Sequence, residues 1–476
     1  MRMMKQAVMS ASVALALSLT ACSATQSTKA QPEPSQSGFQ MPAYEQLQLK
    51  NGLTLMLMPQ HEVPLITVNA VVRAGSVQDT SSGLASLTAK SLLLGNSLKS
   101  KADTELLVDS LGASLNANAG KEGSYISADF MARDAKVMLP LIKAVLLEPS
   151  FDSAEFDKLL QREVASLTRV KESPRAVIGN YFAAQLFGEH PYGNPTSGDS
   201  QSLAGISNQQ VKAFHQNFYQ PANTAITVAG DFELASMKAY LQKLFGDWDT
   251  TSMATQVELN PAPAPTKAKV LLVDKPDAIE TTFVIGGKGI SRDDPDFVGL
   301  QVINTILGGR FTSWLNDELR VNSGLTYGAG SRFTPYRDDG LFFISTFTQT
   351  GTTAETIDLA LKTYDKLWQQ GIDQATLDSA KAYVKGQFPP RYETSGQLAG
   401  LMADMYLYGF DQGFINDFEA SVNGLTLDDA KRLIEKHFPR ENLQFVLIGN
   451  AAEIAPVAAR HGDVRQVEMT APGFAR

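Results

Sequence analysis

The chain has 476 residues, of which 43% are hydrophobic, so it is too long for one hydrophobic core and should form roughly two to four domains. Its 41 Lys and Arg residues against 50 Asp and Glu give a net charge of -9, and no cluster of basic residues is interleaved with aromatic ones. Nucleic acid is therefore excluded as an expected partner.

The first residues, 1–22, have the pattern of an export signal. Arg2 and Lys5 supply positive charge, a short apolar stretch follows, and Leu-Thr-Ala-Cys ends at Cys22. The stretch is too short to span a bilayer. Its end resembles a bacterial lipobox, in which the cysteine is acylated, although an ordinary signal peptide with a chance cysteine has the same appearance. Because Cys22 is the only cysteine, we expect a lipid anchor there; the serine after it resembles an outer-membrane signal, facing the periplasm.

Residues 23–43 are rich in Ser, Thr, Gln, Pro and Ala and contain almost no large apolar side chain. A segment of this composition cannot bury enough apolar surface to become ordered, so we predict a flexible tether. No later run reaches roughly 18 consecutive apolar residues, so membrane contact is expected through the lipid anchor only.

The folded part is predicted to begin with a β-hairpin. Residues 44–49 and 53–58 read as strands, and Asn51-Gly52 between them favours the two positive φ values of a type I′ turn. A further strand and three helices are indicated by periodicity at residues 66–72, 134–147, 153–171 and 176–187. A run of strands followed by a run of helices predicts an α+β sandwich, with helices on one face of an antiparallel sheet.

The second half of the chain repeats the pattern of the first. NTAITVAG at residues 223–230 recurs as NLQFVLIG at residues 442–449, which is 219 residues later. The helix-capping pattern that starts at Ser207 recurs at the same separation at Thr426. A constant separation indicates duplication of one folding unit.

A Pro- and Ala-rich segment, residues 256–267, is predicted to link the two copies. The domains are then residues 44–255 and residues 268–460, followed by a C-terminal tail at residues 461–476.

Several motifs of the first copy resemble the insulinase, pitrilysin and mitochondrial processing peptidase family, over roughly residues 44–460. They are Asn51-Gly52-Leu53, Arg73-Ala74-Gly75-Ser76, Gly83-Leu84-Ala85 and His190-Pro191-Tyr192-Gly193. The resemblance implies two homologous α+β domains that close like a clam shell around an unfolded peptide.

In active members of this family the helix after Gly-Leu-Ala carries H-x-x-E-H, whose two His hold zinc and whose Glu acts as base. Ser86, Ala89 and Lys90 stand at those places here. The family's third ligand, a Glu on a later helix, falls at about Thr168. The resemblance therefore implies a degenerate zinc site, and we expect no metal or other cofactor in this chain.

No replacement zinc site is indicated by the histidines, because no two of them lie three or four residues apart. We interpret all five as capping, packing or surface residues: His61, His190, His215, His437 and His461.

The second copy keeps a different motif. Arg320 and Tyr327 are seven residues apart, after a Gly-Gly loop and around Gly324. The pair is similar to the family's Arg and Tyr that reach substrate at the zinc centre, where a guanidinium and a phenol donate hydrogen bonds to a peptide carbonyl. Without this context, Arg320 would be expected to complement a helix end and Tyr327 to pack in a sheet.

In two-subunit members of the family, one chain carries zinc and the other carries the Arg and Tyr pair. We therefore expect a non-catalytic subunit, inactive alone, that pairs with a zinc-bearing paralogous subunit and acts on unfolded peptides in the periplasm. The alternative is a stand-alone pseudo-peptidase that binds or escorts peptides or an envelope protein. A structural scaffold would leave Arg320 and Tyr327 without a role.

Overall fold

The computed structural model describes residues 38–249 and 259–475, which belong to one compact unit that begins at Gly38. The predicted signal peptide, Cys22, most of the predicted tether and part of the linker lie outside the described residues. Across the described ranges, none of the helices is both long enough and apolar enough to cross a membrane.

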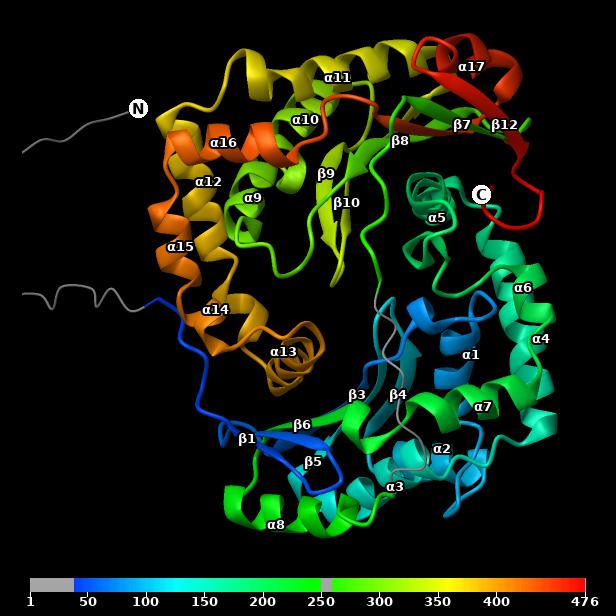
Figure 1. Cartoon of the computed structure of the whole chain (residues 1–476), viewed down its shortest axis with the longest axis vertical. Coiled ribbons are helices and arrows are strands. Elements are labelled where there is room, and N and C mark those ends of the chain that lie inside the picture. The colour runs from blue at the N-terminus through cyan, green and yellow to red at the C-terminus, as the bar shows by residue number, and fades with distance from the viewer. Residues whose placement is uncertain (1–37, 250–258, 476) are drawn as a thin grey trace, which may run out of the picture. The chain divides into compact units, whose positions relative to one another are not determined.

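Six strands of the first half form one sheet (Figure 1). They are β1 (Glu45–Gln48), β2 (Thr54–Pro59), β3 (Leu65–Val72), β4 (Ser114–Ala119), β5 (Ser124–Met131) and β6 (Thr224–Gly230). Their order across the sheet is β1-β2-β6-β3-β5-β4. The pairing is antiparallel except between β2 and β6, which run parallel.

Six strands of the second half form the other sheet. They are β7 (Lys269–Asp274), β8 (Glu280–Lys288), β9 (Gly330–Pro335), β10 (Gly340–Gln349), β11 (Gln444–Gly449) and β12 (Asp463–Glu468). Their order is β12-β7-β11-β8-β10-β9, so five strands repeat the order of the first sheet. The predicted pair of homologous α+β domains is confirmed, with sheets that are mixed rather than wholly antiparallel.

The sixth strand enters the two sheets from opposite ends of the sequence. In the first sheet β1 precedes and pairs antiparallel with β2. In the second sheet β12 comes last and pairs parallel with β7. Residues 461–476, expected to be a tail outside the second domain, therefore supply its edge strand.

Helices of each half cover its sheet. Those of the first half are α1 (Leu84–Ser91), α2 (Lys101–Ser110), α3 (Ala135–Leu147), α4 (Ser153–Val170), α5 (Pro174–Phe187), α6 (Ser200–Ala204), α7 (Asn208–Phe218) and α8 (Leu234–Phe245). Those of the second half are α9 (Phe297–Asn304), α10 (Trp314–Asn316), α11 (Thr353–Gln369), α12 (Gln374–Gly386), α13 (Ser395–Tyr408), α14 (Gln412–Asn416), α15 (Phe418–Gly424), α16 (Leu427–His437) and α17 (Ala451–Ala458).

The predicted capping boxes are present at the starts of α7 and α16. The side chains of Ser207 and Thr426 each accept a hydrogen bond from the backbone N–H three residues on. In turn, the side chains of Gln210 and Asp429 accept from the backbone N–H groups of Ser207 and Thr426. These bonds satisfy N–H groups that a helix start leaves unpaired.

Each half contributes one helix that packs on the sheet of the other half. Helix α13 of the second half packs on β3 and β6 of the first sheet, and α5 of the first half packs on β11 and β8 of the second. Alternate side chains of one strand therefore face different partners: Leu55 and Leu57 join the core of the first half, whereas Met56 and Met58 join the cluster that includes α13. Each sheet is thus covered on both faces, which extends the expectation of helices on one face.

The hairpin of β1 and β2 closes differently from the prediction. Only Gly52 has a positive φ, +93°, and its N–H donates to the carbonyl of Leu49 at 3.0 Å, so the turn is not type I′. Asn51 instead uses its side-chain amide to donate to the carbonyls of Phe245 and Trp248 at 2.9 and 3.0 Å. The side chain ties the hairpin to the end of α8.

The end of the predicted tether, from residue 38 on, is packed. The Phe39 ring stacks on Tyr392 with centroids 5.5 Å apart, and Met41 is buried in the core of the second half. The N–H of Met41 donates to the side-chain oxygen of Asn416 at 2.9 Å. The prediction of a flexible tether is therefore wrong for residues 38–43, because their apolar side chains find a partner in the second half.

Candidate functional site

Helix α1 carries the positions at which the resemblance places a zinc motif. Its start is fixed by Asp79, whose carboxylate accepts hydrogen bonds from the N–H groups of Gly83 and Ala85 at 2.8 and 2.7 Å. Burial raises the pKa of Asp79 to about 7, although these bonds favour its ionised form. Ser86 and Ala89 are both buried on α1.

Lys90, the next of these positions, forms an ion pair. Its ammonium lies 2.5 Å from a carboxylate oxygen of Glu163 on α4. Thr168, the expected third position, is exposed, and its hydroxyl donates to the carbonyl of Val164 at 3.0 Å. Glu163 rather than Thr168 is therefore the α4 side chain that meets Lys90.

The residues at these four positions do not fit zinc. Ala89 offers no ligand atom, and neither Ser86 nor Thr168 is a usual zinc ligand. The ammonium of Lys90 already occupies Glu163, the nearby carboxylate, and would repel a second cation. These four positions therefore do not provide a zinc site.

Arg320 and Tyr327 lie on either side of a helix end. Arg320 belongs to the π-helical turn Asp317–Asn322, which ends as the N–H of Gly324 donates to the carbonyl of Arg320 at 3.2 Å. Gly324 has φ +66°, a left-handed conformation that glycine adopts without strain. Tyr327 lies in the loop before β9 and is 82% exposed, so it does not pack in the sheet.

Two threonines of the neighbouring strand β10 hold this loop. Thr348 donates from its hydroxyl to the carbonyl of Leu325 at 2.8 Å. Thr346 donates from its hydroxyl to the carbonyl of Gly328 at 2.9 Å, and its oxygen lies 3.1 Å from the hydroxyl oxygen of Thr326. Because Thr346 and Thr348 lie on β10, the loop that carries Tyr327 is fixed to the second sheet.

The structure brings Arg320 and Tyr327 to one pocket of about 440 Å³. The guanidinium carbon of Arg320 lies 4.6 Å from the centre of the Phe311 ring, which restricts the arginine side chain. The pocket is further lined by Glu280, Gly324, Leu325, Thr326, Phe347, Thr348, Gln349 and Thr352. None of these comes from α1, so the pair and the zinc-motif positions do not share this pocket.

The Gly-Gly segment before this site is needed for a close approach. A Cβ atom on Gly308 would lie 2.2 Å from the backbone nitrogen of Ser331 on β9, which no side chain tolerates. Gly308 therefore seats the helical segment after α9 against the edge of the second sheet.

A residue of the first half also reaches the pocket wall, which the sequence analysis missed. Arg175, at the start of α5, has its guanidinium carbon 3.3 Å from the centre of the Phe347 ring and forms an ion pair with Glu280 at 2.8 Å. Both partners line the pocket of Arg320 and Tyr327. No local signal marks Arg175, because its role depends on the exchange of α5 between the halves.

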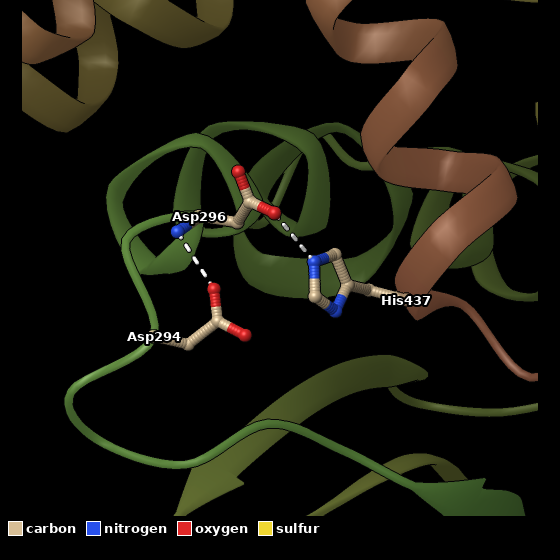
Figure 2. Close-up of side chains that lie close together, drawn as sticks. All are labelled: Asp294, Asp296 and His437. Carbon is tan, nitrogen blue, oxygen red and sulfur yellow. Dashed lines mark hydrogen bonds and ion pairs between the residues drawn. The ribbon is translucent and has the colours of Figure 1, made fainter.

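A cluster of side chains of the kinds that bind metal ions lies between α9 and α16 (Figure 2). Its residues are Asp294, Asp296 and His437. The Asp296 carboxylate already accepts hydrogen bonds from Arg432 at 3.1 Å, Lys436 at 2.8 Å and the His437 ring at 2.8 Å. Hydrogen-bond donors fill this carboxylate, two of them the charged side chains of Arg432 and Lys436, so the cluster ties the start of α9 to the end of α16 and does not suit a metal ion.

We expect Asp296→Asn to destabilise the fold by roughly 2 kcal/mol at neutral pH, because charged hydrogen bonds to a side chain only 11% exposed are lost. These hydrogen bonds hold the pKa of Asp296 well below its usual range, although burial opposes them. A lowered pKa stabilises the fold above the unfolded value of about 3.9 and stops doing so as the pH falls through the folded pKa. Urea unfolding should therefore show the wild type losing its advantage below about pH 4, with Asp293→Asn in the same loop as control. An equal loss at every pH would contradict this account.

The sequence matches two family models. Residues 56–200 match "Insulinase (Peptidase family M16)", and residues 205–384 match "Peptidase M16 inactive domain", so together they cover more than half of the chain. A protein named an uncharacterized zinc protease, from Mycobacterium leprae, is 26% identical over 88% of this chain and 94% of its own length. YmxG of Bacillus subtilis, with the same description, is 23% identical over 71% of this chain and 81% of its own length.

Solved structures show the same fold. A peptidase M16 inactive domain from Pseudomonas fluorescens superposes with a TM-score of 0.80 and 25% identity, over 86% of this chain and 98% of that one. A protease from Helicobacter pylori superposes with a TM-score of 0.78 and 22% identity, over 86% of this chain and all of that one.

Proposed function

The chain belongs to the insulinase family of zinc peptidases, family M16, and from that premise we propose that it is the non-catalytic subunit of a zinc metallopeptidase complex. One observation carries the proposal: the zinc-motif helix holds Lys90 in an ion pair with Glu163, while Arg320 and Tyr327 line a common pocket. The substrate is an unfolded peptide, and the metal belongs to a zinc-bearing paralogous partner.

Arg320 and Tyr327 are assigned to substrate binding. The Arg320 guanidinium is held against Phe311 and the Tyr327 phenol is exposed, so both have donors available to a peptide carbonyl. Donors fixed in place before the reaction stabilise the negative charge that develops on such a carbonyl. The partner would supply the metal and its water to the same peptide bond.

We predict that the isolated chain retains well below one zinc per molecule after dialysis and cleaves no unfolded peptide, because Ser86, Ala89, Lys90 and Thr168 supply neither ligands nor a base. Co-expressed with a zinc-bearing paralogue, it should purify as a complex with one zinc for the two chains. Elemental analysis by mass spectrometry measures both ratios. One tightly held zinc on the isolated chain would overturn the assignment.

Stand-alone peptide capture is the second candidate function. Its support is a group of exposed apolar side chains near the same pocket: Ile279, Phe311, Val321 and Tyr327. These would bind apolar side chains of an unfolded peptide without a partner. Tight peptide binding by the chain alone, together with failure to pair with any zinc-bearing paralogue, would favour this function.

We further propose that Cys22 is acylated and anchors the mature chain to the outer membrane, facing the periplasm. The support is the lipobox at the end of the export signal. Mass spectrometry of the mature N-terminal peptide should find an acylated Cys22, and the protein should partition into detergent. An unmodified start after Cys22 with a fully water-soluble protein would contradict the anchor.

A further inference from the structure

Two pockets of the described residues adjoin at Arg391 and share no residue with the pocket of Arg320 and Tyr327. The first, about 520 Å³, lies along the edge strand β9 and is lined by parts of α9 and α12. The second, about 510 Å³, lies between α13 and the first sheet.

Arg292 contacts one aromatic ring from each of the two pockets. Its guanidinium carbon lies 4.3 Å from the centre of the Phe297 ring, which lines the first pocket, and 4.4 Å from the Phe410 ring, which lines the second. Three rings, with Phe414 as the third, hold this arginine in place. We name the two pockets together the arginine groove, after Arg292, Arg332 and Arg391, which line it.

The charge of the arginine groove is opposite to that of the whole chain. The net charge of the protein is -9, yet the first pocket is lined by Arg332 and Arg391 and by no carboxylate. The second pocket has one carboxylate, Asp404: burial raises its pKa to about 6 and the nearby Arg292 opposes this rise, so one negative charge stands there at neutral pH against Arg292 and Arg391. Within the described ranges, neither Arg332 nor Arg391 forms an ion pair with a carboxylate.

The remaining lining is polar and uncharged at several places. Asn69 and Asn118 on the first sheet contribute side-chain amides, and Tyr125 and Tyr392 contribute phenols. The Gln397 amide is already bound at the start of α13, where it accepts from the N–H groups of Glu393 and Thr394 and donates to the carbonyl of Pro390. Such groups donate and accept hydrogen bonds with peptide backbone. Guanidinium groups without a partner, in a pocket, favour carboxylates.

We propose that the arginine groove binds an extended, acid-rich peptide segment, with Arg332 and Arg391 on its carboxylates and the amide side chains on its backbone. The arginine groove is lined by residues of the edge strand of the second sheet and of the first sheet, so an extended chain could contact both. This site goes beyond the proposed function, since it requires neither a partner subunit nor zinc.

The test is fluorescence anisotropy on the full chain with two labelled peptides of equal length, one rich in Glu and one with every Glu replaced by Gln. The Glu peptide should bind at least about tenfold more tightly, and Arg332→Glu or Arg391→Glu should weaken it by about tenfold each. Arg133→Glu, which changes an exposed arginine of the first half, is the matched control. Circular dichroism checks that each variant is folded.

Equal affinity for the two peptides would overturn the proposal, as would an equal loss in Arg133→Glu, which would indicate a general effect of net charge. Anionic lipid vesicles form a separate arm: if they bind through Arg332 and Arg391 while the Glu peptide does not, a membrane surface is the occupant and the peptide proposal fails. A loss of Glu-peptide binding in Arg332→Glu or Arg391→Glu assigns the peptide to the arginine groove, since neither residue lines the pocket of Arg320 and Tyr327.

Discussion

Arg320→Ala and Tyr327→Phe should each lower the turnover of the reconstituted complex by about a hundredfold, the usual effect of removing one donor to a developing oxyanion. The side chains line one pocket and reach substrate only if the partner presents a peptide there. Turnover is measured on an unfolded reporter peptide with the zinc-bearing paralogue in excess, and the Arg133→Ala complex is the control.

The same variants separate catalysis from stability. Tyr327 is 82% exposed, so loss of its hydroxyl should change the free energy of unfolding by less than about 0.5 kcal/mol. Arg320 packs on Phe311, so its truncation should cost about 1 kcal/mol. Variants that lose stability but retain full turnover once folded would show that the pair is structural, and peptide capture would become the better account.

Tyr192→Phe should destabilise the fold by about 2 to 3 kcal/mol, because its hydroxyl joins the two halves. The hydroxyl lies 2.5 Å from a carboxylate oxygen of Glu122, in the β4–β5 loop, and accepts from the N–H of Asp338 at 3.2 Å, in the β9–β10 loop. The N–H of Arg337 donates to the same Glu122 oxygen at 2.7 Å. Without the hydroxyl, a buried carboxylate and a backbone N–H each lose a partner.

Tyr181→Phe is the matched control for this change. Tyr181 is as deeply buried as Tyr192, but its hydroxyl has no hydrogen-bond partner among the described residues, so its removal should be neutral or slightly stabilising. Burial raises the pKa of Glu122, so the charge that Tyr192→Phe leaves unsupported disappears as the pH falls through that raised value. The difference between wild type and Tyr192→Phe should therefore shrink in acid. Equal effects of the two substitutions in thermal melts would contradict this role of Tyr192.

Local sequence patterns predict the fold best where all the interacting groups lie within a few residues of one another. The capping boxes at Ser207 and Thr426 are formed as expected, since a capping box needs only residues within one helical turn. The prediction of a type I′ turn at Asn51-Gly52 is wrong, because the side-chain amide of Asn51 donates to the distant carbonyls of Phe245 and Trp248. These partners lie almost 200 residues further along the chain, so the residues around Asn51 do not indicate them.

The exchange of α5 and α13 could not be predicted from the strands. Residues 54–58 form a nearly continuous apolar run because both faces of β2 are buried, one by the first half and one by α13. The run itself does not identify which helix covers which face. For the same reason the contact of Arg175 with Phe347 and the packing of residues 38–43 on the second half were missed.

Local spacing and long-range helix packing contribute differently to the candidate site. Arg320 and Tyr327 line one pocket, because seven residues around Gly324 fix their relation locally. Their contact with substrate stays a prediction. The sequence did not identify the α4 side chain that contacts Lys90, which is Glu163, and the match of Thr168 to the family's third ligand stays a prediction. The relation between α1 and α4 depends on the packing of two helices about seventy residues apart, which local periodicity does not determine.

Titration of this chain into a fixed amount of its zinc-bearing paralogue tests the central claim most directly. The readout is the initial rate of cleavage of an unfolded reporter peptide. If this chain is the subunit that supplies Arg320 and Tyr327, the rate should rise from near zero and level off at one chain per partner, and titration of the Arg320→Ala variant should reach a plateau about a hundredfold lower. A paralogue that is fully active before any of this chain is added, with no change on titration, would contradict the account.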